Sequence, residues 1–200
     1  MKLFNIAALA LVLTGSSLAS PVISQAGSVF DGNKTWPVYP MHFTGSVTTD
    51  GPVLDLYGSV QELIPKIQKL DPKWTPPKRK NVSRHEPGLV KRYFHGDPVC
   101  NPAGAGDADL TELEREVIPY LQGLGTGNCG AYAHSCSRVS CAWDSAVFLC
   151  NNNPVEIHVS CERIGDAAQH IVSRCVILDG VCGYWPDTTG YSVSVQYSSC

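Results

Sequence analysis

The sequence predicts a small disulfide-rich α+β sandwich in its second half, with one antiparallel sheet covered on one face by two helices. Three observations predict this fold. All nine cysteines follow the dibasic pair Lys91-Arg92. Two segments, 110–121 and 161–175, carry apolar residues at helical spacing, and several short segments alternate polar and apolar residues as strands do.

The first predicted helix begins after Asp109, which forms a capping-box pattern with Glu112. Its apolar residues share one face, which we expect to be buried: Leu110, Leu113, Val117, Ile118 and Leu121. Because Pro119 lacks a backbone donor, we expect the helix to kink or end near Ile118, with Gly123 as a terminating cap.

The second predicted helix spans Cys161 to Cys175, with Ser160 as its N-cap and Arg174 near its negative end. Cys161 and Cys175 lie on the same face, about 21 Å apart along a straight helix. A disulfide cannot span that distance, so each must pair with a different neighbouring element.

Four strands are predicted around these helices. Segments 139–143 and 146–150 read as a pair around the turn Asp144-Ser145, and 155–159 alternates like a third strand. Segment 191–197 has the clearest alternation in the chain. Together with the helices they complete the α+β sandwich.

Residues 1–19 are typical of a secretory signal peptide cleaved after Ala19, and their apolar run is too short to span a membrane. An oxidising destination, with no Cys-x-x-Cys spacing, favours disulfides over a metal site. Nine cysteines allow four bridges with one thiol left over, and the spacing alone leaves the connectivity open.

Residues 20–92 resemble the basic pro-segment of secreted fungal precursors that kexin-type proteases cut after Lys-Arg, which predicts cleavage after Lys91-Arg92. They carry ten Lys and Arg against six Asp and Glu, whereas residues 93–200, the predicted mature domain, carry four against twelve. We expect this segment to be mostly disordered, with one short helix near Leu63 that Pro65 interrupts. Both N-glycosylation sequons, at Asn33 and Asn81, lie within it.

The motifs Arg138-Val139-Ser140-Cys141 and Leu149-Cys150-Asn151 stand among the cysteines of residues 99–200. This pattern resembles small secreted cysteine-rich proteins of filamentous fungi, many of them candidate effectors. The closing run 193–200 is similar to the end of the virally encoded killer toxins of smut fungi, which are secreted α/β sandwiches that block calcium channels. Their action rests on a basic surface, whereas residues 93–200 are acidic and contain no lysine. Relative to this pattern Cys182 is additional, so the resemblance implies that it is the unpaired thiol. The bridged residues are then the other eight cysteines: Cys100, Cys129, Cys136, Cys141, Cys150, Cys161, Cys175 and Cys200.

One group of residues could support catalysis. His158, Glu162 and Arg163 combine a base, a carboxylate and a guanidinium, the set that a secreted guanyl-specific ribonuclease uses. Their alternative roles are an exposed strand residue and charges at a helix terminus. The glycine-rich run 125–130 follows a helix instead of a strand, so we expect a loop and not a nucleotide site.

A weaker candidate depends on cleavage after Arg92. The new N-terminus would then place His95 third, where the terminal amine, two amide nitrogens and the imidazole could bind copper(II). A histidine at this position more often has no such role, and we expect neither a resident metal nor a cofactor.

The sequence therefore favours a secreted, extracellular binding protein over an enzyme. We expect it to be a monomer without a membrane span that engages a host or competitor protein or glycan, as an effector or a toxin does. Its net charge of −8 over residues 93–200 argues against nucleic-acid binding. The alternative is a small ribonuclease-like hydrolase. Four aromatic residues belong either to a contact surface or to the core: Tyr132, Trp143, Trp185 and Tyr191.

Overall fold

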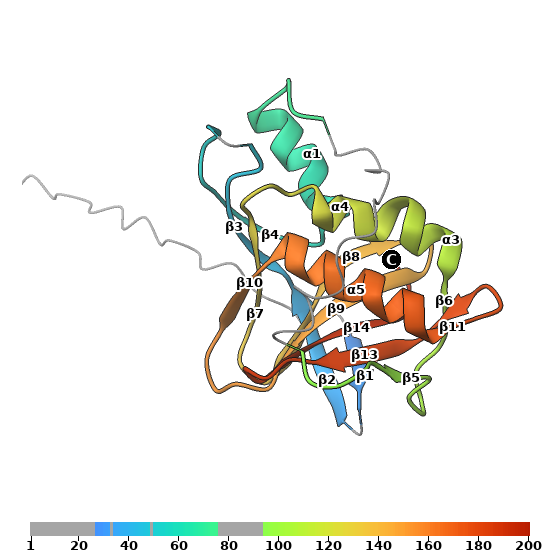
Figure 1. Ribbon diagram of the computed structural model, residues 1–200. Coiled ribbons are helices and arrows are strands. Elements are labelled where there is room, and N and C mark those ends of the chain that lie inside the picture. The colour runs from blue at the N-terminus through green and yellow to red at the C-terminus, as the bar shows by residue number, and fades with distance from the viewer. Residues whose placement is uncertain (1–26, 33, 49, 76–93) are drawn as a thin grey trace, which may run out of the picture.

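The computed structural model describes residues 27–32, 34–48, 50–75 and 94–200 (Figure 1). Within these ranges the chain has a disulfide-rich α+β architecture with three sheets, three helical segments and four disulfides. The predicted cleavage site at Ala19, the dibasic pair Lys91-Arg92 and the sequons at Asn33 and Asn81 lie outside the described residues and stay predictions.

The largest sheet has seven strands and is mixed. Strand β2 runs parallel to β8, with Val38 opposite Cys136, and the other neighbouring strands are antiparallel. The expectation of one antiparallel sheet is therefore wrong, because a strand from the N-terminal third of the chain enters beside β8. The strand order is β1 (Gly27–Asp31), β2 (Lys34–Pro40), β8 (Ser135–Ala142), β9 (Ser145–Asn151), β14 (Tyr191–Tyr197), β13 (Gly183–Pro186) and β5 (Val99–Cys100).

Strands β8 and β9 form the central hairpin of this sheet. Trp143 and Asp144 form its turn, and both have a positive φ, 48° and 62°. Two such residues are typical of a type I′ turn, whose twist matches that of the flanking strands. The hairpin was predicted, although its turn lies one residue earlier than expected and both strands are longer. Strand β14 has the predicted bounds.

Two smaller sheets accompany the large one. The four-stranded sheet has the order β10 (Ile157–Ser160), β7 (Asn128–Ala131), β3 (His42–Gly45) and β4 (Leu54–Tyr57). The predicted strand 155–159 thus corresponds to β10 but lies outside the large sheet. The three-stranded sheet consists of β11 (Val176–Ile177), β12 (Gly180–Val181) and β6 (Ala108–Asp109).

The first predicted helix runs on past Pro119. It consists of α3 (Leu110–Glu112), the π-helical turn η1 (Leu113–Val117) and α4 (Ile118–Gln122), and Gly123 follows as the C-cap. In η1 the amide of Ile118 donates to the carbonyl of Leu113, five residues back. This wider turn accommodates Pro119, which has no backbone donor. The helix therefore continues where the sequence predicted a kink or an end.

Helix α5 (Cys161–Cys175) has the predicted bounds and the predicted Ser160 cap. It packs against β13 and β14, and the α3–α4 segment packs against α5, β8 and β9. Figure 1 shows α4 and α5 side by side across one face of the large sheet. Both helices bury their apolar faces against the strands, which is the source of the main core.

The N-terminal segment is part of this core. Met41, Phe43 and Leu63 are completely buried, and α1 (Val60–Leu70) packs against β8. The side chain of Gln61 donates to Ser140 Oγ at 2.9 Å. The expectation of disorder is therefore wrong for the described residues between 27 and 75. Their apolar side chains are buried by pairing with strands far away in the sequence, which local composition does not reveal.

The eight cysteines expected to be bridged form four disulfides, and Cys182 is buried and free. Two disulfides hold the ends of α5: one joins its first residue to β7, the other joins its last residue to β5. The third links β8 to β9, and the fourth ties the chain end to β8. The pairs are Cys129–Cys161, Cys100–Cys175, Cys136–Cys150 and Cys141–Cys200.

Cutting the chain after Arg92 should leave its two parts bound to each other. The cysteines all lie in the second part, so no disulfide holds the first. In its described residues, buried apolar side chains and hydrogen bonds hold it, and each large buried side chain contributes about 1.5–3 kcal/mol. After digestion with a kexin-type protease, the fragments should co-elute in native size-exclusion chromatography and separate on a denaturing gel without reductant. Phe43→Ala should weaken the association, whereas Val53→Ala, at an exposed position, should not. Separation of the fragments under native conditions would contradict this prediction.

Cys182 should be unreactive in the folded protein. Burial, followed by the nearby negative charge of Asp107, raises the pKa of its thiol to about 11, so little reactive thiolate forms at mildly alkaline pH. Mass spectrometry after iodoacetamide treatment should show no adduct on the native protein and one adduct after unfolding without reductant. Cys182→Ser should abolish that adduct. Rapid alkylation of the native protein would show that the thiol is accessible.

Candidate functional site

The three residues singled out for catalysis lie at the junction of β10 and α5. His158 is on β10, whose last residue, Ser160, accepts a hydrogen bond from the amide of Arg163 at 3.4 Å. A strand passes directly into a helix here, so neighbouring side chains point in different directions. His158 and Arg163 line one pocket, whereas the exposed Glu162 does not contribute to its lining.

This β10–α5 pocket has a volume of about 510 Å³. It lies where β10, the start of α5 and the turn preceding β14 meet. Its lining combines hydroxyl, amide, imidazole and guanidinium groups with the apolar surface of Ile157, Val159 and Tyr191, so it offers both polar and apolar contacts to a ligand. The lining residues are Asn153, Ile157, His158, Val159, Ser160, Arg163, Thr189 and Tyr191.

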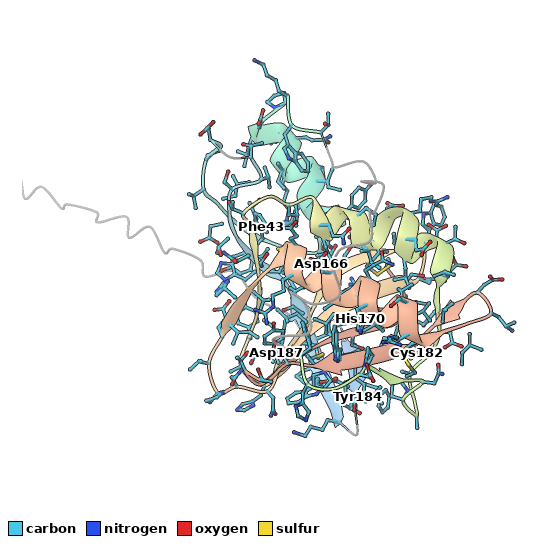
Figure 2. All side chains as sticks on the ribbon, viewed as in Figure 1. Phe43, Asp166, His170, Cys182, Tyr184 and Asp187 are labelled. Carbon is cyan, nitrogen blue, oxygen red and sulfur yellow. A yellow bond between two sulfur atoms is a disulfide. The ribbon has the colours of Figure 1, made fainter. Side chains whose placement is uncertain are left out.

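Arg163 is held in place by a buried carboxylate. Asp187 Oδ2 accepts from Arg163 Nη2 at 2.7 Å, and its other oxygen accepts from the amide and the hydroxyl of Thr189 at 2.8 and 2.6 Å. The guanidinium also lies 5.8 Å from the ring centroids of Phe94 and Tyr191. In Figure 2 Asp187 lies below the N-terminal half of α5. The guanidinium is thus fixed at the pocket wall and its charge is largely compensated.

Tyr191 lines the pocket, and its hydroxyl oxygen is buried. Burial raises the pKa of Tyr191 well above its usual value, although the positive charge of Arg163 opposes the shift. The phenol therefore stays protonated at any physiological pH. Together with the Arg163–Asp187 pair, it makes this wall polar without a strong net charge.

A second group of polar residues lies on the outer face of the four-stranded sheet. We name His42, Asp55, Glu156 and His158 the histidine cluster. His42 Nδ1 is 2.8 Å from Glu156 Oε1, and its Nε2 is 3.0 Å from Asp55 Oδ1. The same Glu156 oxygen is 3.4 Å from His158 Nε2. One carboxylate oxygen therefore stands between two imidazoles.

Strand register brings these residues together. His42 on β3 and His158 on β10 are both paired with Gly130 on β7, so the two imidazoles project from the same face. A Cβ on Gly130 would lie 3.0 Å from His158 Cε1. Because glycine leaves this space free, the rings approach to 5.0 Å between centroids. Glu156 precedes His158 by two residues and therefore shares its face.

Two tyrosines border the cluster. The ring of Tyr57 stacks on His42 with 4.5 Å between centroids, which fixes the orientation of the imidazole. Burial, followed by the charges of Tyr57 and Glu156, raises the pKa of Tyr132 to about 12. Both residues thus provide neutral walls, and the negative charge of the cluster comes from its two carboxylates.

His95, the candidate copper ligand, is exposed and lies outside the histidine cluster. Its backbone amide donates to the carbonyl of Pro186 at 2.8 Å. A copper site at a new N-terminus would take that amide nitrogen as a ligand, so it would have to break this bond. The copper proposal stays a prediction that carries this cost.

The four aromatic residues have different environments. Trp185 and Tyr191 are buried, and Trp185 Nε1 donates to the carbonyl of Gly96 at 3.0 Å. Tyr132 is half-buried beside Tyr39, whereas Trp143 is 72% exposed at the tip of the β8–β9 hairpin. They therefore do not form one contact surface.

Sequence reasoning missed His42, Asp55, Glu156 and Asp187. The alternation of 155–159 places Glu156 and His158 on one face and could have identified that pair. His42 and Asp55 reach the cluster only through the pairing of β3 with β7 and β4, which no local pattern in the sequence indicates.

Comparison with known protein families finds no match to this chain, and no solved structure matches it. A flavohemoprotein of Vibrio cholerae is 32% identical over 80 residues, covering 38% of this chain and 20% of the flavohemoprotein. The chain thus spans about a fifth of the length of that relative, and this similarity does not show a family. In the part of the chain that the structure describes, no helix is long and apolar enough to cross a membrane.

Arg163→Ala should destabilise the fold. It removes the positively charged partner of the buried Asp187 carboxylate and leaves neutral donors such as Thr189, so we expect a loss of about 2–4 kcal/mol of unfolding free energy. Urea denaturation followed by tryptophan fluorescence measures it. Arg174→Ala is the matched control, because its partner Asp97 is 4.0 Å away and exposed, and we expect at most about 0.5 kcal/mol. Equal losses in the two variants would contradict a structural role of the Arg163–Asp187 pair.

Proposed function

We propose that the protein acts outside the cell as a disulfide-stabilised binding protein, effector-like or toxin-like, and that its β10–α5 pocket binds a sugar unit of an extracellular glycan. The observation that carries the proposal is the pocket of about 510 Å³, with mixed polar and apolar walls, whose guanidinium is fixed by a buried carboxylate. A binding site formed by rigid groups loses little conformational entropy when its ligand binds.

Four disulfides support the extracellular part of the proposal. Such crosslinks persist in oxidising compartments, and each contributes about 2–4 kcal/mol of stability. Two of them hold both ends of α5, the helix that provides Arg163. The pocket is thus anchored by covalent links that a secreted protein retains in its working environment.

The chemistry of the lining favours a sugar. Asn153, Ser160 and Thr189 offer amide and hydroxyl groups, and Arg163 adds donors in a planar fork. Because Asp187 compensates the guanidinium charge, the pocket does not favour a strongly anionic ligand. The net charge of −8 over residues 93–200 further disfavours nucleic acids.

A small hydrolase is the second candidate, because His158 and Arg163 do line one pocket. Its third predicted member, Glu162, is exposed away from that pocket, and the carboxylate nearest His158 is Glu156 at 3.4 Å. The constellation that the ribonuclease hypothesis requires is therefore incomplete at this pocket. An RNA degradation assay separates the two candidates.

The decisive experiment blocks the pocket. Thr189→Trp places a large ring on an exposed turn residue of the lining and also removes the hydroxyl that donates to Asp187. It should weaken glycan binding at least about tenfold, because the ring fills the space that the sugar needs. Binding of the purified secreted protein is screened on a glycan array and measured by calorimetry for the best oligosaccharide. Val155→Trp, an equally bulky change at a position 64% exposed and outside the lining, should bind like the wild type.

The same samples are incubated with RNA. We expect the RNA to stay intact with the wild type and with His158→Ala. RNA degradation that His158→Ala abolishes would support the hydrolase and overturn the binding proposal. Failure of every glycan to bind, or binding that Thr189→Trp leaves unchanged, would also overturn it.

A further inference from the structure

We propose that His42, Glu156 and His158 form a binding site for a divalent transition-metal ion of the zinc class. This site goes beyond the proposed glycan binding and does not depend on it. The ligand atoms are His42 Nδ1, Glu156 Oε1 and His158 Nε2, and all three lie within 4.8 Å of one another.

The distances suit a metal ion after small adjustments. Ligands about 2.0–2.1 Å from a tetrahedral zinc ion lie about 3.3 Å apart. The Glu156–His158 separation of 3.4 Å already agrees, and the Glu156–His42 separation of 2.8 Å must open slightly. Glu156 and His158 are about one-third exposed, so their side chains have room to move. His42, 14% exposed, is the fixed member of the set.

The surroundings are compatible with the imidazole tautomers that metal binding requires. Asp55 Oδ1 lies 3.0 Å from His42 Nε2 and can accept a hydrogen bond from a protonated Nε2, which leaves the lone pair of Nδ1 for the metal. A carboxylate that orients a ligating histidine in this way is a common feature of zinc sites. Thr44 Oγ1 lies 3.5 Å from His158 Nδ1 and can accept a hydrogen bond from a protonated Nδ1, leaving Nε2 free to ligate. Both histidines thus present their available nitrogens toward Glu156.

The ligand types select the metal class. Two imidazole nitrogens and one carboxylate oxygen suit zinc and its neighbours, whereas magnesium and calcium prefer sites made of oxygen alone. Three protein ligands leave a fourth position for water or for a donor atom of another molecule. His158 also lines the β10–α5 pocket, so an ion held here lies beside the proposed glycan site.

The ion would link the two parts of the chain that no disulfide joins. His42 belongs to β3 in the N-terminal segment, whereas Glu156 and His158 lie in the cysteine-rich part, across the intervening strand β7. Metal binding should therefore raise the thermal stability of the folded protein, because the unfolded chain does not hold these ligands together.

The test titrates zinc chloride alone into the full secreted protein after removal of metals with a chelator. Calorimetry should show one zinc per chain, and the melting temperature should rise with zinc. His42→Ala and His158→Ala should each weaken zinc binding at least about a hundredfold, because a three-ligand site loses one of its ligands. Asp55→Asn, which changes only the group that orients His42, should weaken it about 10–100-fold.

Two exposed residues outside the cluster provide matched controls. His95→Ala and Asp50→Asn should bind zinc like the wild type. If His95→Ala still binds zinc, the candidate copper ligand His95 is excluded as the source of the binding. Circular dichroism establishes that each variant is folded. Absence of stoichiometric zinc binding by the wild type, or binding that His42→Ala and His158→Ala leave unchanged, would overturn the proposal.

Discussion

The fixed position of helix α5 is the constraint on which the rest of the structure depends. One disulfide ties its first residue, Cys161, to β7 in the four-stranded sheet, and another ties its last residue, Cys175, to β5 at the edge of the large sheet. Since both ends are held, the helix fixes the two sheets relative to each other. The junction where β10 becomes α5 is thereby a rigid point of the fold, and both candidate sites lie there.

His158 connects these two sites although their electrostatics differ. On the pocket side the guanidinium of Arg163 is paired with a buried carboxylate, so the wall is polar and nearly neutral. On the outer face two carboxylates surround the imidazole of His42, and negative charge is in excess. A neutral polar wall suits a sugar, whereas an excess of negative charge with imidazole nitrogens suits a cation. The junction of β10 and α5 would thus place a sugar-binding pocket next to a cation-binding cluster.

The elements predicted from the sequence are those whose signals are local. The Ser160 cap and the spacing of Cys161 and Cys175 gave the bounds of α5, and alternation gave those of β14. Local signals did not predict the structure of the N-terminal segment. Phe43, for example, lies in the short strand β3, which pairs with β7, far away in the sequence. Pro119 was misjudged because a π-helical turn can absorb a missing donor. Only part of the candidate site was predicted. His158 and Arg163 were recognised from the sequence as a base and a guanidinium, whereas His42, Asp55 and Asp187 reach their sites only through strand register and turn geometry.

The hydrogen bonds of the histidine cluster do not by themselves balance the negative charge of its two carboxylates. Both ring nitrogens of His42 face carboxylate oxygens, at 2.8 and 3.0 Å, and the ring is only 14% exposed. Two carboxylates that converge on one imidazole repel each other unless a positive charge lies between them, and burial strengthens this repulsion. A divalent ion held by His42 and Glu156 would supply two units of positive charge and would also engage His158. The acidic character of residues 93–200 acts in the same direction. The proposed cation would thus balance the negative charge of the two carboxylates and would occupy the imidazole nitrogens that face Glu156.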